Sequence, residues 1–381
     1  MQLSQSDFSQ RKEKILLYIT GSLGDTLVAI PAVRAVRRNF PDAELILLQH
    51  DPLGHNAEIS QIIPDELVDG YLSYNTHAEK ADKISIFRQL WSNLRKQNFQ
   101  AAVYLVSSER PARSVRRDKL FFRSCGIKRL IGFHPFSKDK LYPLDSQNRP
   151  ALTISEAELK LERLRLDGIK TSEAEDFQLP LLKFSKAEIE TAEKWLATRR
   201  KKPHSRLISI APGCKNPANY WSLENFIEIG QKLLDAEDCE LVVIGGKTEH
   251  SEGEKMVSAW NSGINAAGQF SVRESGALLS LSDFHIGVDT GTTHLAAAVG
   301  TRCFAIYHER YNPGYWHPLG NQHTIIYHPV PCAGCRGLSC PLPDHPCMKN
   351  ISVEAVWRNL RVFMREDKSG RNGKSLKRIA V

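Results

Sequence analysis

Three segments of this chain place glycines beside polar side chains directly after short apolar runs. The first follows the run 15–19 and contains Gly21, Gly24 and Asp25. Glycine lets a backbone approach a ligand closely, and the carboxyl ends of parallel strands are where open α/β sheets bind ligands. Asp25 could remove a proton from a bound hydroxyl or could cap a helix, and the spacing leaves both roles open. Because Pro31 would interrupt a helix begun at Asp25, we expect Gly24 and Asp25 in an exposed loop.

The second segment, residues 287–300, reads as strand, turn and helix. Backbone N–H groups and hydroxyls at a helix N-terminus bind phosphate well, although a capped turn without a ligand would show the same pattern. The number of hydroxyls around one glycine favours phosphate binding. The candidate residues are Asp289, Thr290, Gly291, Thr292, Thr293 and His294.

The third segment, residues 211–221, is a proline-containing loop that follows another apolar run. Lys215 stands where a diphosphate could be met, and long loops of this kind are often functional, though many are only surface connections. The first segment lacks the third glycine of the dinucleotide-binding fingerprint, since Gly21 and Gly24 give only G-x-x-G. The residues of interest here are Pro212, Gly213, Cys214, Lys215 and Asn219.

The elements that must position these segments form two series. Apolar runs at 15–19, 45–48 and 101–106, and again at 207–210, 241–244, 284–288 and 303–307, alternate with helical patterns. Continuous apolar runs are typical of parallel strands buried on both faces. Charged helical stretches at 156–166 and 183–200 separate the two series. We therefore predict an α/β protein with two Rossmann-like domains facing each other across a cleft, 1–180 and 181–352, followed by a C-terminal helix and basic tail at 353–381.

Taken together and in this order, the segments resemble glycosyltransferase family 9, the lipopolysaccharide heptosyltransferases. The resemblance rests on Gly-Ser-Leu-Gly-Asp at 21–25, on the loop ending at Trp221 and on the Asp289 to Ala298 segment, and it spans roughly residues 14 to 358. It implies the GT-B architecture, with the acceptor bound by the N-terminal domain and the nucleotide sugar by the C-terminal one. It also implies inverting transfer that needs no metal and no other cofactor.

The resemblance further implies roles for individual residues. Asp25 would be the base, and the N–H groups around Thr290 to Thr293, with a nearby cation, would stabilise the leaving diphosphate. Glu249 matches the family's ribose-contacting acid and Phe270 its base contact. The family often carries lysine where this chain has Asn219, so Lys215 is the substitute we expect. The donor implied is a nucleotide sugar, with ADP-heptose suspected, and the acceptor is a lipopolysaccharide-core or related glycan.

The charges are unevenly distributed along the 381 residues. The formal net charge is +8, yet residues 110–129 alone hold eight lysines and arginines against Asp118, and residues 361–381 hold a second basic cluster. Such patches imply an anionic partner, although a solvated helix face and a frayed tail would look the same. Ser22 and a row of arginines are therefore our candidates for holding an anionic, lipid-linked acceptor. The arginines are Arg110, Arg113, Arg116 and Arg117, spaced to share one helical face.

The same basic face could lie on the inner leaflet of a membrane, where each cation contributes about 1 kcal/mol. No nucleic-acid-binding motif surrounds it, so nucleic acid is not the partner we expect. No run approaches the ~18 apolar residues of a membrane span, and the first residues lack a secretory signal pattern. We therefore expect a cytoplasmic protein, placed peripherally on the inner face of the cytoplasmic membrane.

Four of the eight cysteines cluster near the C-terminus, at positions 332, 335, 340 and 347. Four thiolates can hold a structural zinc ion tetrahedrally, but this spacing is more compact than that of common zinc knuckles. Thiols packed in a proline-rich loop are the favoured interpretation, and zinc at Cys332, Cys335, Cys340 and Cys347 is the minor one.

Two other functions stay open from the sequence. A nucleotide-sugar epimerase could use the same two-domain architecture, with additional acid and base groups in the cleft and no acceptor site. A non-catalytic relative that binds a glycan or a nucleotide could have kept the fold, and Asn219 in place of lysine is the feature that favours it.

Overall fold

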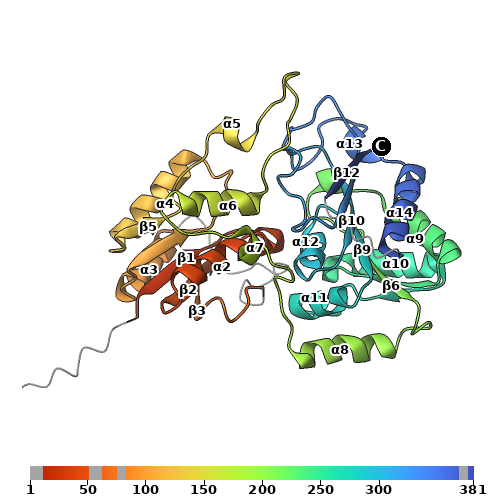
Figure 1. The fold of residues 1–381 in the computed structure, drawn as a ribbon, viewed down its shortest axis with the longest axis horizontal. Helices are drawn as coiled ribbons and strands as arrows, with labels where there is room; N and C mark the ends of the chain where they lie inside the picture. The colour runs from red at the N-terminus through yellow and green to blue at the C-terminus, as the bar shows by residue number, and fades with distance from the viewer. Residues whose placement is uncertain (1–11, 51–61, 75–82, 369–375) are drawn as a thin grey trace, which may run out of the picture.

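The computed structural model describes residues 12–50, 62–74, 83–368 and 376–381. Two parallel sheets stand side by side, each with helices on both faces (Figure 1). Helices α6 and α7 pack on α2 of the N-terminal half, whereas α8 packs on α11 of the C-terminal half. The chain therefore passes from the N-terminal half to the C-terminal half near residue 180, where the boundary was predicted. None of the helices within these ranges is long and apolar enough to cross a bilayer.

The N-terminal sheet has the strand order β3-β2-β1-β4-β5, with all neighbours parallel. The apolar runs at its centre are fully buried on both faces, as the sequence predicted. Its strands are β1 (Lys14–Tyr18), β2 (Glu44–His50), β3 (Gly70–Tyr74), β4 (Ala101–Tyr104) and β5 (Arg129–Ile131). The helices of this half are α1 (Leu23–Leu27), α2 (Ile30–Asn39), α3 (Lys83–Lys96), α4 (Ala112–Ser124), α5 (Lys138–Leu141), α6 (Glu156–Arg165) and α7 (Glu173–Asp176).

The C-terminal sheet has the order β12-β11-β10-β9-β6-β7-β8, again parallel throughout. Its strands are β6 (Arg206–Ala211), β7 (Cys239–Val243), β8 (Ile264–Asn265), β9 (Phe284–Val288), β10 (Cys303–Tyr307), β11 (Thr324–Tyr327) and β12 (Lys377–Ala380). The helices are α8 (Lys186–Ala197), η2 (Pro217–Asn219), α9 (Leu223–Ala236), η3 (Lys247–Glu249), α10 (His250–Trp260), α11 (Val272–Ser280), α12 (Gly291–Ala298), α13 (Pro346–Lys349) and α14 (Val353–Lys368).

The end of the chain differs from a frayed basic tail. Strand β12 pairs in parallel with β11 and completes one edge of the C-terminal sheet. Its cations are engaged, because Lys377 pairs with Glu366 and Arg378 pairs with Glu309 at 2.9 Å. Helix α14 packs on α9 of the same half. The described parts of residues 353–381 therefore belong to the C-terminal sheet and its covering helices.

Candidate active site

Asp25 lies in the first turn of the short helix α1, directly after β1. The N–H and the hydroxyl of Ser22 both donate to its Oδ2, at 2.8 and 2.9 Å. The other oxygen, Oδ1, has no hydrogen-bond partner among the described residues, so it can accept a proton from a bound hydroxyl. Ser22, predicted as an acceptor contact, instead holds the carboxylate in place.

Gly21 and the short helix α1 together set the geometry of Asp25. The position of Asp25 within α1 also corrects a prediction made from the sequence. Gly21 has a φ of +126°, and a Cβ there would lie 2.4 Å from Asp25 Cγ, so only glycine allows the carboxylate to fold back over the turn. The expected exposed loop is wrong, because Gly24 is buried and Asp25 is half-buried within α1. The interruption at Pro31 is confirmed: α1 ends at Leu27 and α2 begins at Ile30, with the proline in its first turn.

The predicted phosphate cradle lies where β9 leads into α12. The N–H groups of the first turn of a helix have no intrahelical acceptor. The Oγ1 of Thr290 is buried and has no partner among the described residues. Thr293 does not fit the prediction, because it is fully buried and its hydroxyl donates to the carbonyl of Val288 at 2.7 Å. The hydroxyls available to a ligand are therefore those of the half-buried Thr290 and Thr292.

Asp289 positions two histidines. Its Oδ2 lies 2.8 Å from Nε2 of His308, and its Oδ1 lies 3.5 Å from Nε2 of His294. Burial by itself would raise the pKa of Asp289, but the hydrogen bonds and charge interactions with these histidines lower it well below its usual value. Burial lowers the pKa of His308, and Asp289 opposes that shift. Asp289 is thus an ionised anchor at neutral pH, with both oxygens engaged.

Asn219 joins this turn to a cation that the sequence did not point to. Its Nδ2 donates to the carbonyl of Asp289 at 2.7 Å, and its Oδ1 accepts from Nη1 of Arg310 at 3.1 Å. Arg310 is 2% exposed, its Nε has no partner, and it forms no ion pair within the described part of the chain. Its Nη2 donates to the hydroxyl of Tyr311. A buried guanidinium without a counter-ion is costly, so this position favours an anionic ligand.

His308 and Arg310 both follow β10, in a segment that our sequence analysis left without a function. They come from another carboxyl strand end of the same sheet, and that position is the signal that could have found them.

The loop at residues 211–221, which we call the predicted donor loop, and the segment after β7 converge. A Cβ on Gly213 would lie 2.3 Å from Cγ of Glu249, so the carboxylate lies directly over this glycine. Glu249 also accepts from the N–H of Gly246 at 2.7 Å. Burial first, and then the nearby carboxylates, raise the pKa of the Cys214 thiol to about 11, so it stays protonated at neutral pH. Lys215 is exposed and unpaired within the ranges that the structure describes.

Phe270 stands apart from this group. Its ring packs edge-to-face on Trp195 of α8, with centroids 4.8 Å apart, and it is only half-buried. Its proposed contact with a nucleotide base stays a prediction.

The two halves meet at α1 and α12. A Cβ on Gly291 would lie 3.1 Å from Leu23, and one on Gly24 would lie 3.3 Å from the ring of His294. The turn that carries Asp25 therefore lies against the helix that begins the phosphate cradle. This contact brings together the residues predicted from opposite ends of the chain.

The predicted row of four free arginines is only partly present. Arg110 and Arg117 both pair with the buried Asp118, at 2.9 and 2.7 Å. Arg113 and Arg116 are exposed and form no ion pair in the portion of the chain that is described. The exposed cations of this row that have no ion pair are therefore Arg113 and Arg116.

The cysteine segment does not form a metal site in this structure. No three His, Cys, Asp or Glu residues among those described are grouped so that they could hold a metal ion. Cys332 and Cys335 are exposed, whereas Cys347 is buried. Of the four thiols, only that of Cys347 fits the favoured interpretation of packed thiols, and a zinc ion at this segment stays a prediction.

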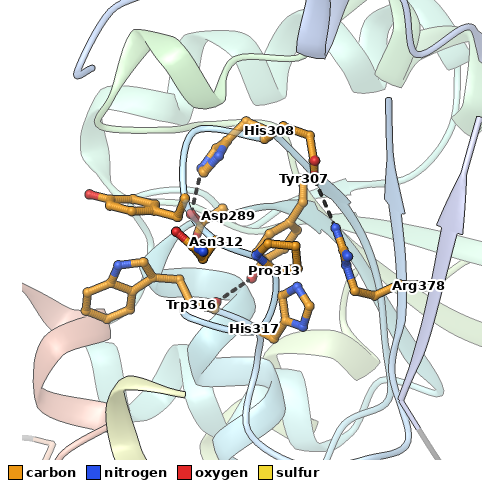
Figure 2. A pocket seen from close by; sticks show the side chains of 10 residues that line it. Asp289, Tyr307, His308, Asn312, Pro313, Trp316, His317 and Arg378 are labelled. Carbon is orange, nitrogen blue, oxygen red and sulfur yellow. Dashed lines mark hydrogen bonds and ion pairs between the residues drawn. The ribbon is translucent and has the colours of Figure 1, made fainter. Parts of the chain in front are cut away.

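A small cavity of about 280 Å³, a volume that includes open solvent, lies beside Asp289 (Figure 2). His308 points to Asp289 along one wall, and Trp316 and His317 line the other. Because that volume includes open solvent, the enclosed part of the cavity is much smaller and cannot hold a whole nucleotide sugar. It lies next to the cradle rather than forming it.

Comparison with known proteins agrees with this geometry. Residues 168–345 match glycosyltransferase family 9 (heptosyltransferase). Lipopolysaccharide heptosyltransferase 2 of Escherichia coli K12 is 23% identical over 377 residues, covering 93% of this chain and 100% of the relative. Lipooligosaccharide heptosyltransferase 2 of Campylobacter jejuni is also 23% identical, over 90% of this chain and 96% of its own.

Solved structures show the same fold. A family 9 glycosyltransferase from Veillonella parvula aligns with a TM-score of 0.69 at 15% identity, covering 93% of this chain and 97% of that one. The Escherichia coli ADP-heptose lipopolysaccharide heptosyltransferase II aligns with a TM-score of 0.63 at 19% identity, covering 93% and 99%.

Two facing Rossmann-like domains, each built on a parallel sheet, give this chain the GT-B fold of these solved structures. Within that fold, residues 168–345 match glycosyltransferase family 9, and the chain is similar over 90% or more of its length to lipopolysaccharide heptosyltransferases. These similarities favour glycosyl transfer over the epimerase and over the non-catalytic relative.

Proposed function

We propose that this glycosyltransferase moves a heptose from ADP-heptose to a lipopolysaccharide-core or related glycan, with inversion at the anomeric carbon and without a metal. The single observation that carries the proposal is the placement of the open Oδ1 of Asp25 on a turn that lies against α12. The heptose and the adenine nucleotide rest on the relatives, which are heptosyltransferases and include one solved as an ADP-heptose enzyme.

In the proposed reaction, Asp25 accepts the proton of the acceptor hydroxyl as that oxygen bonds to the anomeric carbon. The bond from this carbon to the diphosphate oxygen breaks on the opposite face, and the nucleoside diphosphate leaves with the electron pair. A carboxylate is effective here once it lies within hydrogen-bond reach of the hydroxyl, which typically contributes 10²–10⁴-fold. Ser22 fixes one oxygen and leaves the other for this proton.

The leaving diphosphate needs positive charge and N–H donors. We propose that the first turn of α12, with the hydroxyls of Thr290 and Thr292, supplies the donors. Arg310 is the cation best placed for the role, because it is buried, lacks a counter-ion and is held by Asn219 next to this turn. Lys215 is a second, exposed candidate on the donor loop. Glu249, lying over Gly213, is proposed to bind the ribose hydroxyls.

The acceptor would be an anionic, lipid-linked glycan bound by the N-terminal half. Arg113 and Arg116 stay exposed on α4 for such a partner. We propose that the enzyme works in the cytoplasm at the inner face of the membrane, where a lipid-linked acceptor is reached.

Two measurements test the proposal. Thermal denaturation with a panel of nucleoside diphosphates should show stabilisation by ADP, since a ligand at 100 times its dissociation constant adds about 2.7 kcal/mol. Incubation with ADP-heptose and a heptose-deficient core glycan should then give a product of opposite anomeric configuration. Binding of another nucleoside diphosphate in place of ADP would overturn the donor, and a retained configuration would overturn the inverting mechanism.

A further inference from the structure

Helices α3 and α4 share an exposed surface at the end of the N-terminal half that faces away from the C-terminal half (Figure 1). They pack together through Phe87 and Phe121, whose ring centroids are 4.7 Å apart. The indole N–H of Trp91 and the guanidinium of Arg95 both donate to the carbonyl of Ser124. The two helices therefore form one continuous face, which we call the α3–α4 face.

Large apolar side chains are exposed on this face. Ile84 is 62% exposed, Phe87 is 54% exposed and Leu120 is 67% exposed. Single exposed hydrophobic residues are ordinary, but three on two adjoining helices form an apolar cluster that water solvates poorly.

The charges around that cluster have one sign. Helix α3 contains no acidic residue, and the only one in α4, Asp118, is buried and paired with Arg110 and Arg117. Arg116 and Arg117 lie four and three residues before Leu120, and Arg113 lies one further turn back, so the three arginines share the side of α4 that carries Leu120. The exposed cations of the face are Arg88, Arg95, Lys96, Arg113, Arg116, Arg117 and Arg123.

Exposed apolar side chains surrounded by exposed cations fit an anionic bilayer surface. Aromatic and aliphatic groups insert at the boundary between headgroups and acyl chains, while arginines bind the lipid phosphates. Nucleic acid would use the cations but would leave the aliphatic side chains in water, so the surface favours lipid. We propose that the α3–α4 face docks this enzyme on anionic lipid bilayers, with Ile84, Phe87 and Leu120 entering the interface.

The inference deepens the proposed function, since it names the surface through which a lipid-linked acceptor would be approached. It does not depend on that function, because lipid binding can be measured without donor or acceptor.

The experiment is sedimentation of the full chain with vesicles of phosphatidylcholine alone or mixed with phosphatidylglycerol. We expect binding to the mixed vesicles only, weakened by salt. The double variant Phe87→Ser/Leu120→Ser should bind at least ~10-fold more weakly, because about 0.8 kcal/mol is lost for each CH₂ no longer buried. The double variant Arg88→Gln/Arg123→Gln should lose ~10-fold or more at low salt and show a shallower salt dependence.

Matched controls come from elsewhere on the surface. Leu166→Ser removes a leucine that is 60% exposed at the end of α6, and Arg358→Gln/Arg361→Gln removes two exposed arginines of α14. Both should bind vesicles as the unchanged protein does.

Some outcomes would overturn the proposal. Equal binding by the apolar variant and the unchanged protein would show that no insertion takes place at this face. Tighter binding to a DNA duplex than to the anionic vesicles would show a nucleic-acid surface instead. Normal transfer to a water-soluble acceptor fragment by the Phe87→Ser/Leu120→Ser variant would keep the proposed function separate from the docking surface.

Discussion

Asp25 and Asp289 occupy similar places in the two halves of the molecule but meet opposite surroundings. Each follows the carboxyl end of a central parallel strand and stands at the start of a helix. Asp25 is half-buried and has one oxygen without a partner, whereas Asp289 is nearly buried and has both oxygens engaged by histidines. The comparison teaches that the fold supplies the position, and that the neighbouring side chains decide whether a carboxylate can accept a proton or can only hold its neighbours.

Replacing Asp25 with asparagine should produce the largest effect. Asparagine cannot take the proton of the acceptor, so turnover should fall by about 10²–10⁴-fold. ADP affinity should be unchanged because the proposed donor site lies in the C-terminal half. Steady-state rates together with calorimetric titration of ADP would check this.

The corresponding change at Asp289 provides the contrast. Asp289→Asn should reduce the free energy of unfolding by about 1–3 kcal/mol, because the buried ring N–H of His308 loses its carboxylate acceptor. If Asp289→Asn instead lost turnover at full stability, while Asp25→Asn kept turnover, the roles we assign to the two residues would be reversed.

Arg310 should matter more than Lys215 for the leaving group. Removing a positioned donor or charge from the developing anion typically costs about 10²–10³-fold in turnover, so Arg310→Gln should lower kcat by that factor. Lys215→Ala, at an exposed position, should lower it less than tenfold, and Lys247→Ala should lower it least. Arg302→Gln removes another buried arginine, one that pairs with Glu366, and controls for loss of packing. A larger loss of kcat for Lys215→Ala than for Arg310→Gln would mean that Lys215, and not Arg310, stabilises the leaving group.

The C-terminal half should lose stability in acid before the N-terminal half. Burial lowers the pKa of His285 and His317 to about 3 and that of His323 to about 4. A histidine whose pKa is lowered on folding stabilises the fold fully above its unfolded value of ~6.5, and that contribution is lost as the pH falls toward the folded value. Each should cost about 2 kcal/mol between pH 7.5 and pH 5.

Hydrogen exchange of peptides from each half, at the two pH values, would measure this difference. His134 of the N-terminal half is 39% exposed beside Asp167, and it serves as the internal contrast. Equal loss of protection in the two halves would contradict the prediction.

The smallest effects are expected at Thr290 and Thr293, where substitution should change ADP affinity in one case and stability in the other. Thr290→Val removes a hydroxyl without a partner among the described residues, so it should weaken ADP binding several-fold at unchanged stability. Thr293→Val removes the hydrogen bond to Val288 and should cost about 1 kcal/mol of stability with ADP affinity retained. Titration calorimetry and urea unfolding of both variants would check the pair, and the opposite assignment would mean that Thr293 faces the ligand.

Central strands were predictable from the sequence because burial on both faces leaves an apolar run. The predicted runs correspond to β1, β2, β4, β6, β7, β9 and β10. The strands not predicted are short or lie toward the edges of the sheets, where fewer apolar residues are needed. Strand β12 was not predicted because its sequence is basic. Its cations pair with Glu366 and Glu309 only after folding.

The parts of the candidate site that lie at the ends of single strands were predictable from the sequence. Strand ends pointed to Asp25, Asp289 and the donor loop, and these do lie at the carboxyl ends of β1, β9 and β6. The hydrogen bond between Asn219 and Arg310 could not be predicted from the sequence. The two residues are 91 positions apart and come together only when the ends of two strands lie side by side. The burial of the Thr293 hydroxyl was missed because the turn pattern does not show which side of a helix faces the core.

The glycines at 24 and 291 have a consequence for any attempt to redesign this enzyme. Each marks a point where one half of the molecule touches the other with no intervening Cβ. One added methyl group at either position would lie 3.1 or 3.3 Å from the facing side chain, so that side chain would have to shift by a few tenths of an ångström. The spacing between the proposed proton acceptor and the proposed diphosphate site therefore depends on two missing side chains, neither of which belongs to a reacting residue.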